Sequence, residues 1–98
     1  DGRPHHHLIG LPIELSAETW GNAMLQEEPD KVVPTLQELA LARANAPKFF
    51  KKNWYWSCEE HASAAGYAWC QGFDDGDQTF TSKGNKLRVR FFRRLEIL

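Results

Sequence analysis

Three carboxylates lie close together in the last third of the chain, where Asp74, Asp75 and Asp77 surround Gly76. Closely spaced carboxylates suit a hard cation such as Ca²⁺. However, no glutamate follows at the distance that would add a bidentate ligand. Because Asp and Gly are also favoured in tight turns, the segment is interpreted as a solvated hairpin turn, and no metal site is predicted.

A second set of reactive side chains comprises Ser57, Cys58, His61 and Cys70. Ser57 or Cys58 with His61 would supply a nucleophile and a base, but no third group that would orient His61 is evident. A metal site of Cys58, His61 and Cys70 would need a fourth ligand and a closer pair. A disulfide between the two cysteines is possible, although two free thiols are favoured. We therefore assign no catalytic residue and predict that the protein is not an enzyme.

Basic residues dominate the C-terminal segment, with aromatic residues interleaved at Phe80, Phe91 and Phe92. Such a pattern can bind nucleic acid through phosphate contacts and base stacking. The alternative function is therefore that of a small intracellular accessory protein that binds nucleic acid or a host nucleic-acid enzyme through this basic strand. The basic residues are Lys83, Lys86, Arg88, Arg90, Arg93 and Arg94.

The length of 98 residues, with 42% apolar residues and four tryptophans, predicts one domain over residues 1–98 with an aromatic core. The net charge of −1 points to no class of partner. No apolar run is long enough to cross a membrane, so no membrane span is predicted. The chain begins at Asp1, not at Met, which suggests a fragment or a processed product.

The first half of the chain predicts a strand and two helices. After an Asp1-Gly2 turn, residues 7–9 are expected to form a strand ended by Gly10 and Pro12, whose partner would lie upstream of Asp1. The histidine run 5–7 could bind a metal or be a tag remnant, but its neighbours favour the start of this strand. Residues 16–28 predict a helix, with Ser16 as N-cap, Glu18 in the first turn, and an apolar face of Trp20, Ala23 and Met24.

The second helix has the clearest local signal. Thr35 and Glu38 form a capping-box pattern, and Asn45 and Pro47 mark the end. Its expected apolar face is Leu36, Leu39 and Ala40, with the tip of Arg43 solvated.

After Lys52 the pattern changes to period two, which is typical of strands. Strands are predicted at 54–57, 67–73, 78–82 and 87–92, with turns at 74–77 and 83–86. The predicted fold class is therefore α+β, with two helices and an antiparallel meander.

Six spaced motifs carry a resemblance to a known family: PTLQEL, YWSCEEH, YAWCQGF, the DDGDQ turn, a lysine at 83 or 86, and LRVRFFRR. Over residues 16–94 the chain resembles the Lcl C-terminal domain family. That family has unknown function and a C-type-lectin-like fold, which is related to the formylglycine-generating-enzyme architecture.

The resemblance implies that Trp56, Trp69 and Phe73 are core anchors and that Gly76 makes the turn. It also implies that Arg88 and Arg90 pair or stack near residues 56–59, where Glu59 or Glu60 offers a carboxylate. Cys58 departs from the Ser or Thr that is usual in the family. The catalytic cysteine pair of formylglycine-generating enzymes and the sugar-and-calcium tripeptides of true C-type lectins are not found, so no activity or cofactor is carried over.

Small members of the family occur in phage and prophage genomes, and some resemble the variable proteins of diversity-generating retroelements. The resemblance thus implies a display module that binds a protein or a cell-surface glycan and that can form a homo-oligomer. Its location would be a phage virion or the bacterial cytoplasm. The expected ligand-binding residues lie between and after the aromatic anchors: His61, Ala64, Ala65, Tyr67, Cys70, Gly72, Asp74, Asp75, Asp77, Thr79, Phe80 and Ser82.

Overall fold

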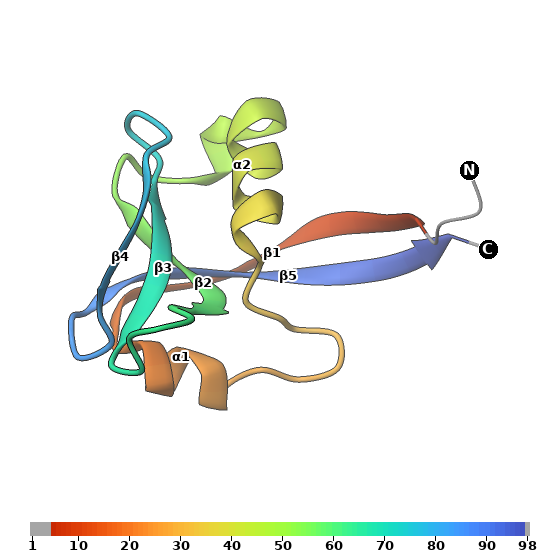
Figure 1. The fold of residues 1–98 in the computed structure, drawn as a ribbon. Helices are drawn as coiled ribbons and strands as arrows, with labels where there is room; N and C mark the ends of the chain where they lie inside the picture. The colour runs from red at the N-terminus through yellow and green to blue at the C-terminus, as the bar shows by residue number, and fades with distance from the viewer. Residues whose placement is uncertain (1–4, 98) are drawn as a thin grey trace.

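Five strands form one sheet in the order β1-β5-β2-β3-β4 (Figure 1). The computed structural model describes residues 5–97. The class is α+β with two helices, as predicted. In chain order the elements are β1 (His5–Glu18), α1 (Trp20–Leu25), α2 (Leu36–Asn45), the 3₁₀ turn η1 (Pro47–Phe49), β2 (Trp54–Glu60), β3 (Tyr67–Gly72), β4 (Gln78–Ser82) and β5 (Leu87–Ile97).

The long strands β1 and β5 pair antiparallel and form a ribbon that projects from the rest of the fold (Figure 1). Within the described residues the partner of the first strand is β5, and the strand expected upstream of Asp1 stays a prediction. The strand also continues past Gly10 and Pro12, so its predicted end is wrong. The β1–β5 ladder is irregular between Gly10 and Glu14 and then resumes. Proline is tolerated in an edge strand at such an irregularity. The predicted Asp1-Gly2 turn lies outside the described residues.

Helix α1 is shorter than predicted. Thr19 caps it by accepting a hydrogen bond from the Asn22 amide at 3.4 Å, whereas Ser16 belongs to β1. The N-cap prediction is wrong because Glu18 still pairs with Leu87, so β1 runs to the edge of the helix. The predicted apolar face is correct: Ala23 is buried, and Trp20 and Met24 pack against the same core.

Helix α2 begins and ends as predicted. The Thr35 hydroxyl accepts from the Glu38 amide at 3.1 Å, and the Glu38 carboxylate accepts from the Thr35 amide at 2.8 Å. The apolar face differs from the prediction, because Leu39 and Ala42 are the buried residues of α2 and Ala40 is exposed. Arg43, whose tip was expected in solvent, is partly exposed, and its tip donates a hydrogen bond to the Asp74 carbonyl at the surface.

Strands β2, β3 and β4 form the predicted antiparallel meander, but β5 does not continue it. Instead β5 returns to lie between β1 and β2 and pairs in parallel with β2, with Tyr55 opposite Arg88. The sheet is therefore mixed. This placement buries Val89 and Phe91 against Trp56 in the core on the α1 side.

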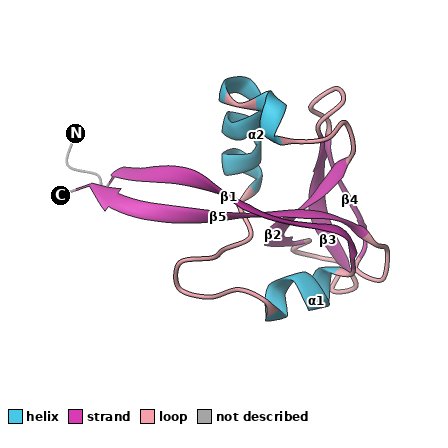
Figure 2. Ribbon diagram, turned by 180° about the vertical axis from the view of Figure 1, so that it is seen from behind, coloured by secondary structure: helices cyan, strands magenta, loops and turns pink. Residues whose placement is uncertain are grey.

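The sheet carries one apolar core on each face. On the α1 side, Trp56 packs with residues of α1, β3 and β5, and its indole donates to the Glu18 carbonyl at 2.8 Å. On the α2 side, Phe50 and Phe73 stack with ring centroids 4.0 Å apart. The two helices lie on opposite sides of the β1–β5 ribbon (Figure 2). Trp56 and Phe73 are buried, as the resemblance implies, whereas Trp69 is only half-buried.

Candidate interaction surface on the β3–β4 hairpin

Four aromatic side chains, His61, Tyr67, Trp69 and Phe80, form a contiguous group that we call the aromatic cluster. His61 stacks on Trp69 with ring centroids 5.5 Å apart and an interplanar angle of 11°. Phe80 meets the other three rings edge to face, at 4.4 Å from His61, 5.2 Å from Trp69 and 5.9 Å from Tyr67. Tyr67 is 43% exposed and Phe80 44% exposed, so the cluster offers an aromatic surface to solvent.

Strand pairing explains why these side chains meet. Trp69 lies opposite Phe80, and Tyr67 lies opposite Ser82, so their side chains point to the same face of the hairpin. His61 joins them because the loop between β2 and β3 closes tightly: the His61 amide donates to the Tyr67 carbonyl at 2.9 Å. The His61 ring is held by its Nδ1 atom, which accepts from the Ser63 amide at 3.2 Å.

A charged pair lies on the α1 side of the sheet, at the end of β2 and just after β4. Lys83 lies 2.7 Å from the Glu60 carboxylate and 4.6 Å from the centroid of the Trp20 ring. The Lys83 amide also donates to the Gly66 carbonyl at 2.9 Å, which ties the end of β4 to the loop before β3. Exposed aromatic rings such as those of Tyr67 and Phe80 are typical of surfaces that bind other molecules.

Part of the predicted ligand face is gathered at this surface. His61, Tyr67 and Phe80 are in the cluster, Ser82 lies opposite Tyr67, and Ala64 accepts a hydrogen bond from the Tyr67 amide. Ala65 is exposed in the same loop. Sequence reasoning missed Trp69 as a surface residue, although its position two residues after Tyr67 placed it on the same face of the strand.

Two predicted ligand residues are buried, and these predictions are wrong. Cys70 is 2% exposed and packs with Trp56 and Ala68, and burial raises the pKa of its thiol to about 11. Gly72 is buried beside the Trp54 ring. Both residues point away from Tyr67 because side chains alternate along β3. Thr79, opposite Cys70, is exposed but lies on that other face.

The three aspartates lie exposed in the β3–β4 turn, at the opposite end of β3 from Tyr67. The turn has the predicted form, with Gly76 at φ +84°. The Asp75 carboxylate accepts from the Asp77 amide at 3.0 Å, and this bond lowers the pKa of Asp75. Arg43 of α2 donates to the Asp74 carbonyl at 3.2 Å. Within residues 5–97, no three acidic, His or Cys side chains whose placement is described are grouped to hold a metal ion.

The geometry pairs neither Ser57 nor Cys58, the two predicted nucleophiles, with His61, whose Nδ1 atom instead lies 3.5 Å from the Ser63 hydroxyl. Ser57 is fully buried, and its hydroxyl donates to the Trp69 carbonyl at 2.7 Å. Cys58 is half-buried and, like Cys70, is a free thiol, as favoured from the sequence. Burial raises the pKa of Cys58, although Arg94 opposes this effect. A thiol with a raised pKa is a poor nucleophile at neutral pH.

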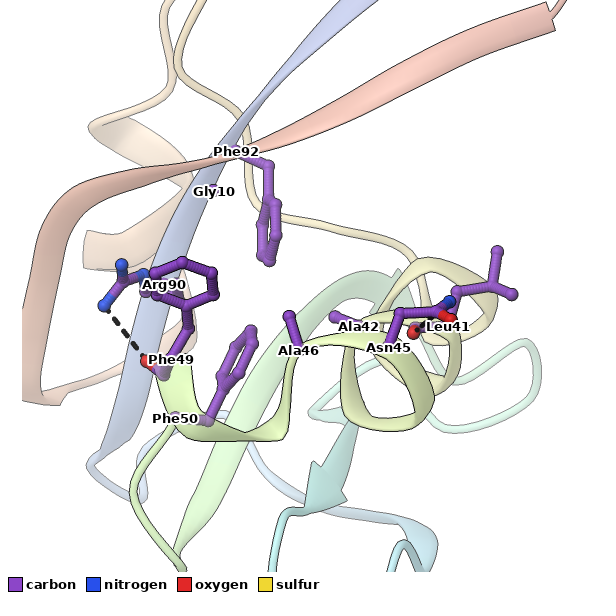
Figure 3. A pocket seen from close by; sticks show the side chains of 9 residues that line it. All are labelled: Gly10, Leu41, Ala42, Asn45, Ala46, Phe49, Phe50, Arg90 and Phe92. Carbon is purple, nitrogen blue, oxygen red and sulfur yellow. Dashed lines mark hydrogen bonds between the residues drawn. The ribbon is translucent and has the colours of Figure 1, made fainter.

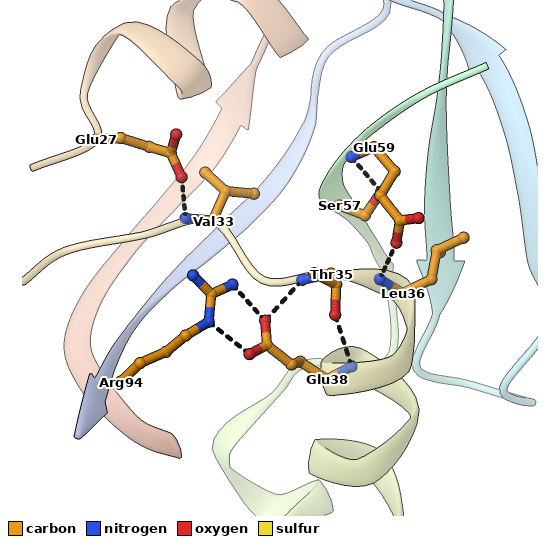
Figure 4. Close-up of polar contacts among 8 residues, drawn as sticks. All are labelled: Glu27, Val33, Thr35, Leu36, Glu38, Ser57, Glu59 and Arg94. Carbon is orange, nitrogen blue, oxygen red and sulfur yellow. Dashed lines mark hydrogen bonds and ion pairs between the residues drawn. The ribbon is translucent and has the colours of Figure 1, made fainter. Parts of the chain in front are cut away.

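Carboxylates near the connector 31–35 and the start of α2 accept hydrogen bonds from backbone amides (Figure 4). Glu59 accepts from the Leu36 amide at 2.7 Å, and Glu27 accepts from the Val33 amide at 2.8 Å. Arg94 binds the Glu38 carboxylate with two hydrogen bonds, at 2.5 and 2.6 Å. These contacts fix α2 against β2 and β5.

The expected pairing of Arg88 and Arg90 with Glu59 or Glu60 is wrong. Arg88 lies 2.8 Å from the Glu14 carboxylate of β1, and Arg90 lies 3.6 Å from its other oxygen. Because Lys83 and Arg94 also pair with carboxylates, four of the six basic residues of the C-terminal cluster are neutralised within the fold.

No protein-family model matches the chain, and a search of curated proteins finds no similar sequence. Among the described residues, no helix combines the length and the apolar character that crossing a membrane requires.

Proposed function

We propose that this chain is a non-enzymatic binding module of phage or prophage type that recognises a protein or a cell-surface glycan through its aromatic cluster. The proposal includes a C-type-lectin-like fold and membership of the Lcl C-terminal domain family. The observation that carries it is the exposure of Tyr67 and Phe80 beside His61 and Trp69 on one face of the β3–β4 hairpin.

Energetics support this interpretation. Exposed aromatic rings cost stability in an isolated domain, whereas on binding they supply a large contact area with little loss of side-chain entropy. The fold buries the Tyr55 and Trp56 side chains completely, whereas Tyr67 and Phe80 stay exposed. The exposure of these two rings is therefore a local property of the hairpin. The order of the elements, two helices followed by the β2–β4 hairpins, also agrees with the proposed resemblance.

The test compares wild type with a Tyr67→Ala/Phe80→Ala double variant. The matched control is Thr79→Ala, on the same hairpin but on the opposite face. Circular dichroism and urea unfolding verify that each variant is folded. Binding is then measured on a glycan array and on envelope proteins of the host bacterium.

We expect wild type and Thr79→Ala to bind the same ligand, and the double variant to bind at least about tenfold more weakly, as for hot-spot residues. Equal binding by the double variant would contradict the proposal. So would a wild-type protein that binds neither glycans nor envelope proteins.

A further inference from the structure

An apolar hollow lies at a different place in the fold, between α2–η1 and the β1–β5 ribbon (Figure 3). Its volume is about 190 Å³. Ala42, Phe50 and Phe92 form the buried floor, while Leu41 and Phe49 stand at the rim with 54% and 60% of their surfaces exposed. A cavity of about 150 Å³ is known to hold benzene, so this hollow can accept a leucine or phenylalanine side chain.

Ring stacking and backbone hydrogen bonds hold the floor of the hollow in place. Phe50 is held by stacking on Phe73, and Phe92 lies nearly parallel to Phe50 with centroids 5.9 Å apart. The amide of Phe92 donates to the Val32 carbonyl, and the Phe92 carbonyl accepts from the Val32 amide, both at 2.8 Å. A preformed pocket binds an apolar anchor without a large ordering cost.

The charge around the hollow is positive. Residues 39–58, which form most of one wall, include no acidic residue and four basic residues. Lys48 and Lys51 are exposed and flank the two lining phenylalanines in the chain. Arg90 also lines the hollow, but it pairs with Glu14 at 3.6 Å, so the two exposed lysines supply the positive charge there. A second copy of this chain would bring equal charges together, whereas an acidic partner would be attracted.

We infer that the hollow is a docking site for an acidic peptide segment that inserts one bulky apolar side chain. The apolar side chain occupies the space above Phe50 and Phe92, and the flanking carboxylates face Lys48 and Lys51. This site is independent of the aromatic cluster, because its lining residues come from α2, η1, β1 and β5.

The test uses a synthetic capped hexapeptide in which Leu-Phe is flanked by two glutamates on each side. Two matched peptides replace the glutamates by lysines or replace Leu-Phe by Ser-Ser. Binding to the isotope-labelled protein is followed by amide NMR. We expect only the acidic apolar peptide to shift the Ala46, Phe49 and Phe92 signals, and raising salt from about 50 to about 500 mM should weaken its binding.

Two variants probe the hollow. A side chain at Gly10 would start 3.6 Å from the Phe92 ring, so Gly10→Leu fills the space, whereas the exposed Phe49→Ala removes a rim contact without touching the core. Each should weaken peptide binding at least about tenfold. Tyr67→Ala/Phe80→Ala should leave peptide binding unchanged, so failure here is distinguishable from failure of the proposed function.

Equal binding of the lysine peptide, equal binding of the Ser-Ser peptide, or unchanged binding by both hollow variants would overturn the inference. Two further results would also overturn it: self-association through this face in sedimentation velocity, or binding to vesicles of anionic phospholipid by a protein that ignores the peptide.

Discussion

Removing the carboxylate of Glu14 should destabilise the protein more than removing any exposed acid. Glu14 accepts from the Tyr55 hydroxyl at 3.0 Å and from Arg88 at 2.8 Å, and it lies 3.6 Å from Arg90. The side chains of Glu14, Arg88 and Arg90 are only 16%, 19% and 14% exposed. Glu14→Ala therefore leaves two largely buried guanidinium groups without their anion.

The magnitude follows from this burial. Breaking a buried ion pair by removing one partner costs about 3–5 kcal/mol, and the residual exposure places Glu14→Ala near the lower end, at about 3 kcal/mol. Glu14→Gln keeps an acceptor for Arg88 and Tyr55 and should cost less, about 1–2 kcal/mol. In a domain of this size 1 kcal/mol corresponds to roughly 4–8 °C in Tm, so Glu14→Ala should lower Tm by at least about 12 °C.

Urea unfolding at neutral pH, with a thermal scan as a second measurement, tests the value. The matched control is Glu60→Ala, because Glu60 is 57% exposed in its pair with Lys83 and should contribute no more than about 0.5 kcal/mol. A double-mutant cycle of Glu14→Ala with Arg88→Ala should give a coupling energy above about 1 kcal/mol. The reasoning is refuted if Glu14→Ala and Glu60→Ala unfold at the same urea concentration.

Two other predictions concern local features. Burial raises the pKa of Glu38, but hydrogen bonds from Arg94 and Thr35 outweigh burial and leave that pKa below its ordinary value. The contribution of Glu38 to stability is thus present above the pKa of the unfolded chain and is lost as pH falls through the lower folded value. Wild type should lose more unfolding free energy than Glu38→Gln between about pH 5 and pH 3, and parallel urea curves across this range would contradict this. Gly76→Ala should lower the unfolding free energy by about 1–2 kcal/mol, since φ is +84° and the added Cβ would lie 2.9 Å from Arg43. The control Gly21→Ala in α1 should raise the unfolding free energy by about 0.5–1 kcal/mol, because the added Cβ meets no atom within 4 Å. Equal stabilities of the two variants in calorimetry would contradict this prediction.

Local signals in the sequence were sufficient where short-range interactions decide the structure. The capping box of Thr35 and Glu38 involves residues three apart, so the start of α2 could be predicted from the sequence. The turn at Gly76 needs a positive φ, which glycine adopts readily.

Long-range pairing was not predictable in the same way. Nothing near Ser16 reveals that β1 continues to Glu18, because the ladder that extends it is formed with Leu87, far along the chain. The return of β5 to a position between β1 and β2 likewise depends on burying Val89 and Phe91. A period-two pattern predicts a strand but does not select its neighbour.

At the candidate surface, too, short-range patterns could be predicted from the sequence and long-range contacts could not. Tyr67 and Phe80 could be expected at the surface, but assigning Cys70 and Gly72 to the same face ignored the alternation of side chains along β3. Trp69 was expected in the core because tryptophan is large and apolar. Its stacking on His61 depends on how the loop between β2 and β3 closes, which spacing alone does not reveal.

The alternation of side chains along β5 also determines which basic residues are paired inside the fold and which can contact a partner. Arg88 and Arg90 alternate with the buried Val89 and Phe91, and their guanidinium groups are paired with Glu14 inside the fold. Nucleic-acid binding through Arg88 or Arg90 would have to break these pairs, which is costly because it leaves a buried charge without its partner. The exposed lysines on either side of the lining phenylalanines of η1 carry no such cost. An acidic peptide can therefore bind at the apolar hollow without breaking an ion pair of the fold.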